Sequence, residues 1–353
     1  MLCFEQFNSN TLAAGGNQSF FHPQGERVGR VYYKVFCGGC YRYAFVFSDV
    51  IDSTFADGSV SRSEDVCGGY TITKLAVGVC DAPGDSPAMQ PVTFGGAVSY
   101  TLQEGETVHT DAVALEAKAG QYLCVEIGFS GNTVPCHTET QIPVFVKVGD
   151  RFVSSTEVPL PGMVGCDRAV KHRVAFLGDS ITQGIGVEPN SYLHWNAVLA
   201  ERLGYDNSYW NLGLGFGRAM DAAKNGAWLN KAKHADVVTV CFGVNDIGRG
   251  RTAEQIVNDL AFIVKTLQES GCRVLLQTVP PFEYSDENRA KWIQINHALR
   301  TEVRPLADAF FDVESVLGDN SSRFGGHPNA EGCRLWAERL EKPLADLINN
   351  LDK

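Results

Sequence analysis

The sequence predicts a chain of two domains: an N-terminal β-sandwich of jelly-roll type and a C-terminal α/β domain with a parallel sheet. Two observations lead to this fold class. Up to about residue 150 the apolar residues occur in short β-like segments, whereas after residue 172 strand-like and helix-like segments alternate. The length of 353 residues also suits two domains better than one.

The first 150 residues contain short segments rich in β-branched and aromatic residues, separated by clusters of Gly, Asp, Ser and Pro. We expect strands at 28–36, 41–47, 70–79, 98–102, 112–116, 122–129 and 143–148. No long helical period occurs in this part of the chain. Many short strands with turn signals between them are typical of a sandwich, so residues 1–150 are assigned to the first domain.

A connector at 151–171, which contains prolines and glycine, separates this part from a second domain at 172–353. In the second domain we expect strands at 173–177, 207–211, 236–242, 273–279 and 308–312, and helices at 191–204, 219–233, 252–270, 285–303 and 329–348. The segment 252–270 carries an apolar stripe with helical spacing. This alternation implies a mainly parallel sheet that helices cover on both faces.

Composition and charge restrict the partners of the chain. The formal net charge of −11 argues against nucleic acid and anionic membranes. No apolar run reaches the length of a transmembrane helix, and the N-terminus shows no secretory signal, so we expect a cytoplasmic protein unless the sequence is trimmed. The 11 cysteines are odd in number and irregular in spacing, which suits a reducing compartment.

One serine lies where a predicted strand gives way to a loop. The apolar run 173–177 is typical of a buried parallel strand; Gly178 then breaks it, and Asp179 and Ser180 follow at its carboxyl end. Ligands bind at that edge of open α/β sheets. The alternative interpretation is a polar turn that only closes the strand, because Ser after Gly is common in turns.

Three later segments add the parts that acyl transfer needs. Such chemistry requires a nucleophile, a base beside it and hydrogen-bond donors aimed at the developing oxyanion. The segments are the glycine-rich 211–217, the strand-like 237–246 that ends in Gly-x-Asn-Asp, and the loop 325–329 before the last helix. Ser180 would be the nucleophile and His327 the base, with the Asn245 amide and a glycine N–H as donors.

This constellation resembles the SGNH (GDSL-type) hydrolase superfamily over roughly the second half of the chain. The matching residues are Gly178 to Ile181, Gly215, Gly243 with Asn245 and Asp246, and His327 to Asn329. The resemblance implies a three-layer α/β/α fold, esterase chemistry, no cofactor and no metal. The superfamily usually has Asn-x-Gly-x-Ser-Gly in its second block; this segment is one residue shorter, and Gly215 is taken as the oxyanion glycine.

The block around His327 departs from the superfamily pattern. Members usually carry Asp-x-x-His, in which the Asp orients the imidazole, but Phe324 stands three residues before His327. Asp319 is the nearest upstream acid that could take this role, since Asp312 is expected to end the last strand. Ser-His dyads occur in this superfamily, notably among some carbohydrate esterases. We therefore expect the His327 Nδ1–H to meet a backbone carbonyl or Asp319.

The first half resembles the β-sandwich that precedes the hydrolase domain in one branch of these esterases. Matching stretches are 43–48, 91–96, 109–115 and 120–125, and a carbohydrate-binding module is the alternative interpretation. In the second half we expect Asp179 and Asp246 to brace loops rather than contact substrate.

These features predict a serine esterase that acts through an acyl-enzyme on short acyl groups, acetyl above all, carried by a carbohydrate. The expected partner is a small-molecule or oligosaccharide ester. Alternatives are a lipase or thioesterase, or a catalytically impaired carbohydrate-binding protein. The acyl length, the alcohol moiety and the oligomeric state do not follow from the sequence.

Overall fold

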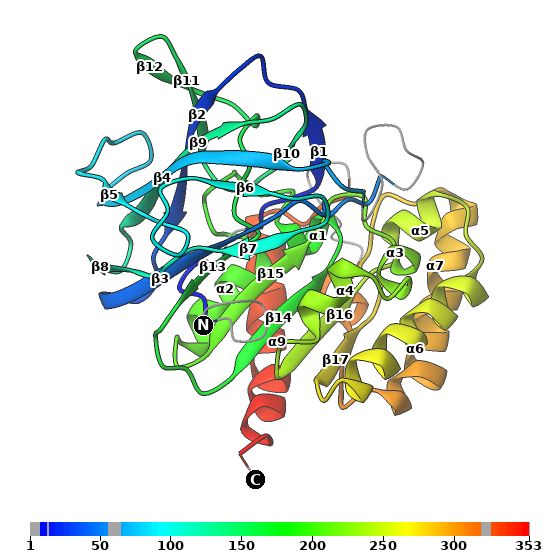
Figure 1. Ribbon diagram of the computed structural model, residues 1–353. Helices are drawn as coiled ribbons and strands as arrows, with labels where there is room; N and C mark the ends of the chain where they lie inside the picture. The colour runs from blue at the N-terminus through cyan, green and yellow to red at the C-terminus, as the bar shows by residue number, and fades with distance from the viewer. Residues whose placement is uncertain (1–7, 13, 56–64, 319–325, 353) are drawn as a thin grey trace. The chain divides into compact units, whose positions relative to one another are not determined.

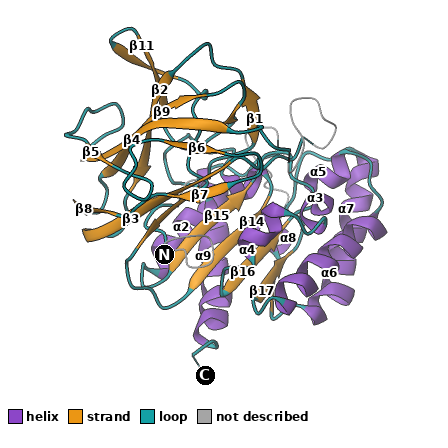
Figure 2. Cartoon of the chain, viewed as in Figure 1, coloured by secondary structure: helices purple, strands orange, loops and turns teal. Residues whose placement is uncertain are grey.

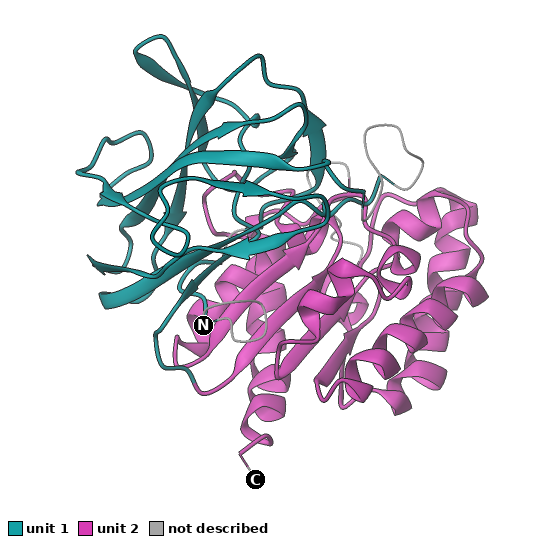
Figure 3. Ribbon diagram, viewed as in Figure 1, with its two compact units in different colours: residues 1–170 teal, residues 171–353 magenta. Residues whose placement is uncertain are grey.

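The chain divides into two compact units, residues 1–170 and 171–353 (Figure 3). The structure is a computed structural model, and it describes residues 8–12, 14–55, 65–318 and 326–352. Within these ranges, no helix combines the length and the apolar character needed to cross a membrane.

Unit 1 consists of antiparallel strands and has no helix among its described residues (Figure 2). The strands are β1 (Gln18–Phe21), β2 (Arg27–Lys34), β3 (Gly39–Ser48), β4 (Tyr70–Cys80), β5 (Gln90–Pro91), β6 (Tyr100–Leu102), β7 (Thr107–His109), β8 (Val113–Ala117), β9 (Tyr122–Ser130), β10 (Val134–His137), β11 (Val144–Val148), β12 (Arg151–Ser154) and β13 (Met163–Cys166). The larger sheet has the order β12-β11-β2-β9-β4, and β5 and β6 both pair with β4. In the smaller sheet β13, β7 and β8 all pair with β3, while β1 pairs only with β10.

One hydrophobic core joins the two larger sheets of unit 1. Alternate residues of β9, such as Val125 and Ile127, share this core with Phe45 and Phe47 of β3. The other face of β9 is covered as well: Cys124 packs in a smaller cluster. A strand buried on both faces is apolar almost throughout, which is why 122–129 is apolar apart from Glu126, which pairs with Arg30 and Lys74. The N-terminal antiparallel β-rich fold is as predicted.

The structure differs from the sequence-based expectation at 151–171, which was expected as a connector. Residues Arg151–Ser154 form β12, which pairs with β11 across a two-residue turn in which Gly149 has φ +59°. Residues Met163–Cys166 form β13, which pairs with β3. The intervening prolines thus mark the passage of the chain from one sheet to the other.

Unit 2 is built on a five-stranded, wholly parallel sheet. Its strands are β14 (Arg173–Gly178), β15 (Ser208–Gly213), β16 (Val237–Cys241), β17 (Arg273–Gln277) and β18 (Ala309–Phe311). The helices are α1 (Ser180–Gln183), α2 (Trp195–Leu203), α3 (Ala219–Ala223), α4 (Ala227–Ala232), α5 (Val244–Gly248), α6 (Ala253–Glu269), α7 (Asp286–Ala298), α8 (Val313–Leu317) and α9 (Ala330–Asn349). The parallel sheet with helices on both faces confirms the predicted α/β class.

The helices of unit 2 form two groups, and the sheet lies between them (Figure 1). In one group α2 packs on α9, where Trp195 stacks on Trp336 with 5.0 Å between ring centroids. In the other group α6 packs on α3 and α7. The expected helix at 219–233 is broken into α3 and α4, because Asn225 adopts φ +59° and Gly226 follows it.

The strand order β15-β14-β16-β17-β18 places a topological switch point between β14 and β16. The chain leaves β14 toward one side of the sheet and enters β16 from the other side. The connections after these two strands therefore run to opposite faces of the sheet, and open α/β sheets bind ligands at the carboxyl edge of such a switch point. Ser180 follows β14 and Asn245 follows β16, so both lie at this point.

Gly213 at the end of β15 gives a test of this packing. A Cβ there would lie 2.1 Å from the backbone N of Gln183, a main-chain atom that cannot move aside cheaply. We expect Gly213→Ala to lower the free energy of unfolding by about 1–3 kcal/mol or more. Thermal denaturation followed by circular dichroism measures this. Gly248→Ala, where a Cβ would meet nothing within 4 Å, is the control, and an equal melting temperature for both variants would contradict the prediction.

Candidate active site

Ser180 is held at the end of β14 by a very close contact of backbone with backbone. A Cβ on Gly178 would lie 2.6 Å from the carbonyl O of Cys241 and 2.1 Å from Thr182 Oγ1, so only glycine fits there. Asp179 then caps α1, since its carboxylate accepts a hydrogen bond of 3.0 Å from the Ile181 N–H. Ser180 is thereby the first residue of a single helical turn at the sheet edge.

The structure brings His327 to Ser180. Ser180 Oγ and His327 Nε2 lie 2.8 Å apart, within hydrogen-bond distance. His327 precedes α9, whose first turn is capped by Asn329 through a 3.0 Å bond from the Gly332 N–H. Gly186 allows this approach: its φ is +109°, and a Cβ there would lie 2.7 Å from His327 Cβ. Sequence reasoning missed Gly186; the only signal is the pair of glycines, two residues apart, shortly after the serine.

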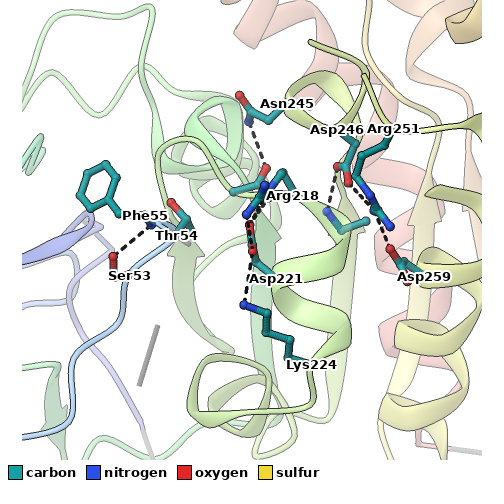
Figure 4. Close-up of polar contacts among 12 residues, drawn as sticks. Ser53, Thr54, Phe55, Arg218, Asp221, Lys224, Asn245, Asp246, Arg251 and Asp259 are labelled. Carbon is teal, nitrogen blue, oxygen red and sulfur yellow. Dashed lines mark hydrogen bonds and ion pairs between the residues drawn. The ribbon is translucent and has the colours of Figure 1, made fainter. Parts of the chain in front are cut away.

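The two expected oxyanion donors lie on neighbouring loops. Gly215 lies in the turn 214–217. A hydrogen bond of 3.2 Å from the Gly217 N–H to the Leu214 carbonyl closes this turn, and Phe216 within it has φ +60°. We call residues 214–217 the oxyanion turn, after the role expected for Gly215. Asn245, in α5, donates from Nδ2 to the Gly217 carbonyl at 3.0 Å (Figure 4). An amide nitrogen carries two N–H donors, so this bond uses one of them to fix the turn.

Asp246, also in α5, holds the start of α3, which follows the oxyanion turn. Its Oδ2 accepts a 2.9 Å bond from the Ala219 N–H, and its Oδ1 accepts from Arg251 Nη1 at 2.8 Å. Arg251 also bonds Asp259, and Arg218 forms a separate pair with Asp221 (Figure 4). Burial raises the pKa of Asp246 in spite of its ion pair with Arg251. Asp246 therefore contacts backbone and arginine, as a bracing residue would.

Phe282 packs against His327 and is a second contact that sequence reasoning missed. The two ring centroids are 5.5 Å apart, and a Cβ on Gly326 would lie 2.5 Å from the Phe282 ring. Tyr284 and Trp292 continue the aromatic contacts behind Phe282, and Trp292 Nε1 donates to the Val279 carbonyl at 2.9 Å. The loop after β17 therefore forms one wall beside the imidazole. Its only sequence signal is an aromatic pair after a strand.

Asp319 and Phe324, which bear on the orientation of His327, lie outside the described residues. Among the residues that the structure describes, no group of three His, Cys, Asp or Glu side chains is arranged to hold a metal ion. The ten described cysteines form no disulfide.

Asp179 is a buried carboxyl group, and burial raises its pKa from 3.8 to about 7. Below about pH 4 the group is neutral in both the folded and unfolded states. Above that pH the unfolded chain ionises while the folded protein resists ionisation, so stability is lost as the pH rises through about 7. We expect Asp179→Asn, which keeps the capping oxygen, to be more stable than the wild type by a few kcal/mol, roughly, at pH 8.

Urea unfolding at a series of pH values from 5 to 8, roughly, measures this difference. The gain in stability of Asp179→Asn should grow with pH across that range. Asp286→Asn is the matched control, because Asp286 is exposed at the start of α7 and has solvent around it in both states. A difference for Asp179→Asn that stays constant with pH would contradict the prediction.

Several solved structures are similar to about half of this chain. One is a member of the lipolytic protein G-D-S-L family from Veillonella parvula, with 20% identity over 48% of this chain and 96% of that chain and a TM-score of 0.43. Another is a carbohydrate esterase family 3 protein from Talaromyces cellulolyticus, with 21% identity, coverages of 50% and 98% and a TM-score of 0.42. A third is a variant of an acetyl-xylooligosaccharide esterase from Geobacillus stearmophilus, with 16% identity, coverages of 50% and 95% and a TM-score of 0.42.

Among curated proteins, none matches the sequence. Residues 176–335 match the GDSL-like Lipase/Acylhydrolase family, and this range contains Ser180, the oxyanion turn, Asn245 and His327. The match supports ester hydrolysis in general by unit 2. Over residues 176–335 this chain is therefore similar to the GDSL-like lipase/acylhydrolase family.

Proposed function

We propose that unit 2 hydrolyses carboxylic esters through an acyl-enzyme, with Ser180 as the nucleophile and His327 as the general base. The observation that carries this proposal is the 2.8 Å separation of Ser180 Oγ and His327 Nε2 at the carboxyl edge of the sheet. A serine hydroxyl is a weak nucleophile unless a base lies beside it to take its proton. The acylhydrolase family of the domain supports the same chemistry.

In the first half of the reaction, Ser180 Oγ attacks the carbonyl carbon of the ester while its proton passes to His327 Nε2. The carbonyl oxygen becomes an oxyanion that accepts hydrogen bonds from the Gly215 N–H, the Ser180 N–H and Asn245 Nδ2. The tetrahedral intermediate collapses when the bond to the alcohol oxygen breaks, and the imidazolium returns its proton to that oxygen. This leaves an acyl-Ser180 ester and a free alcohol.

In the second half, His327 takes a proton from water, and the resulting hydroxide attacks the acyl carbon. The same donors receive the second oxyanion. The bond to Ser180 Oγ then breaks, the imidazolium reprotonates the serine, and the acid product leaves. One ester and one water are consumed, and one alcohol and one carboxylic acid are formed.

A Ser180–His327 dyad is the form of the site that we propose, with Asp319 as the candidate acid if a triad operates. Phe324 occupies the position at which the superfamily usually has the orienting aspartate. Phe282 and Gly186 also pack against His327, through the ring contact and the close backbone approach described above. This packing restricts the direction of the imidazole.

For the substrate, we propose a short acyl group, such as acetyl, on a carbohydrate. Support comes from the dyad-like block around His327 and from the β-sandwich of unit 1, both of which resemble features of carbohydrate esterases. Hydrolysis of p-nitrophenyl acetate, butyrate and octanoate, together with acetylated sugars, tests the proposal. A preference for octanoate would favour a lipase or thioesterase.

We expect Ser180→Ala to abolish ester hydrolysis, because Ser180 Oγ is the atom that forms the acyl-enzyme in this mechanism. Loss of such a nucleophile costs roughly several powers of ten in kcat. Ser180 lies outside the hydrophobic core, so the variant should keep the circular dichroism spectrum of the wild type. A variant that retained most of the wild-type kcat would show that Ser180 is not the nucleophile.

Covalent labelling separates an active serine esterase from a catalytically impaired carbohydrate-binding protein. A fluorophosphonate should label the wild-type protein at Ser180, as mass spectrometry of the tryptic peptide would show, and should not label Ser180→Ala. Absence of labelling in the folded wild-type protein would favour the impaired protein.

Asn245→Ala tests the oxyanion donors. A donor that acts mainly in the transition state lowers kcat by about a hundredfold or more when it is removed, with little change in KM. Asn258→Ala is the matched control, because Asn258 is an exposed asparagine on α6. Steady-state kinetics of both variants provide the measurement, and an effect confined to KM would assign Asn245 to substrate binding instead.

A further inference from the structure

Three buried polar side chains lie behind the helical turn that carries Ser180. His194 directly precedes α2, Asn196 is the second residue of α2, and Asn211 lies in β15. Their exposed fractions are 3%, 0% and 5%. Buried polar side chains are costly unless hydrogen bonds satisfy them, so the partners of these three show what they do.

Two of the three side chains bind the carboxyl end of α1. A helix of a single turn cannot satisfy its own last carbonyls. Asn196 Nδ2 donates to the Thr182 carbonyl at 2.6 Å, and Asn211 Nδ2 donates to the Gln183 carbonyl at 3.3 Å. These bonds fix the end of α1 opposite to Ser180, and in so short a helix they fix Ser180 as well.

The same side chains also connect α1 to the end of β15. Asn211 Oδ1 accepts a 2.9 Å bond from the Gly213 N–H, and Asn211 Nδ2 lies 3.4 Å from Asn196 Oδ1. Gly213 is the last residue of β15, and the oxyanion turn begins directly after it. A continuous series of hydrogen bonds therefore runs from the proposed nucleophile's helix to the proposed oxyanion turn.

His194 determines which way the Asn196 amide points. His194 Nδ1 lies 2.6 Å from Asn196 Oδ1, and a carbonyl oxygen only accepts, so Nδ1 carries the proton. Burial lowers the pKa of His194 to about 4, which keeps the ring neutral near neutral pH with this one proton. With Oδ1 turned to His194, Asn196 Nδ2 must face the Thr182 carbonyl.

We infer that Asn196 is a positioning residue for the proposed ester hydrolysis. Through its contacts with the Thr182 carbonyl, His194 and Asn211, Asn196 fixes the position of Ser180 relative to the oxyanion turn. The inference rests on the proposed function. Asn196 contacts neither substrate nor the reacting atoms, and its effect is on geometry. Displacement of a reacting group by about 1 Å can cost roughly a hundredfold in rate.

Asn196→Asp, assayed at about pH 9, is the sharpest test. It keeps the shape of the side chain, and at that pH an ionised carboxylate has no proton to donate to the Thr182 carbonyl. We expect kcat for p-nitrophenyl acetate to fall by about 10- to 100-fold, with KM changed by less than about threefold. The rate of fluorophosphonate labelling of Ser180 should fall in parallel.

The matched control is Asn207→Asp. Asn207 is also buried and directly precedes β15, but it lies at the amino edge of the sheet, where its Oδ1 accepts from the His172 N–H at 3.2 Å. Asn207→Asp should leave kcat within about twofold of the wild type, whatever it does to the melting temperature, because Asn207 lies at the opposite edge of the sheet from Ser180. If Asn196→Asp behaves like this control, Asn196 is only structural and the inference is wrong.

His194→Phe keeps the test decisive if Asn196→Asp does not fold. This variant retains a buried ring and removes only the donor that orients the Asn196 amide, so kcat should fall by about 3- to 10-fold with KM nearly unchanged. A kcat within about twofold of the wild type in folded His194→Phe would overturn the inference. Failure of the proposed function looks different: either the wild type does not hydrolyse p-nitrophenyl acetate, or Ser180→Ala still does.

Discussion

The packing of a single helical turn against the ends of two neighbouring strands is the contact on which the candidate site depends. Gly178 ends β14 and Gly213 ends β15, and at both places a Cβ would collide with atoms of α1. Because these glycines have no side chain, α1 can lie directly on the strand ends. Ser180, at the start of α1, is thereby placed at the switch point of the sheet.

The close packing of α1 on the strand ends also buries polar groups. Asp179 caps α1 and is buried, and the raised pKa of its carboxyl group expresses the free-energy cost of holding it there. Asp246 is buried too, but the Ala219 N–H and Arg251 offset part of its desolvation. A buried group that is unfavourable for folding is common at functional sites, where part of the stability is given up for a fixed geometry.

Side chains from one loop hold the backbone of another along the carboxyl edge of the sheet. Asn245 binds the carbonyl of Gly217, and Asn196 binds the end of α1. Each of these bonds joins segments that follow or flank different strands, so the loops are fixed to one another. Donors that are fixed before the substrate arrives need no reorganisation during the reaction, which is the property that the proposed oxyanion turn requires.

The sequence by itself determined the local features of this protein. The apolar run before Gly178, the Gly-x-Asn-Asp after a second strand and the change from short strands to strand–helix alternation led correctly to the fold class and to the acylhydrolase family. These features depend only on periodicity and on residues close together in the chain. Tertiary structure decided which loops meet: Ser180 and His327 are 147 residues apart, and Gly186 and Phe282 reach His327 through contacts that no local pattern encodes. Likewise, 151–171 looked like a connector because its two short strands acquire partners only in the folded sheets.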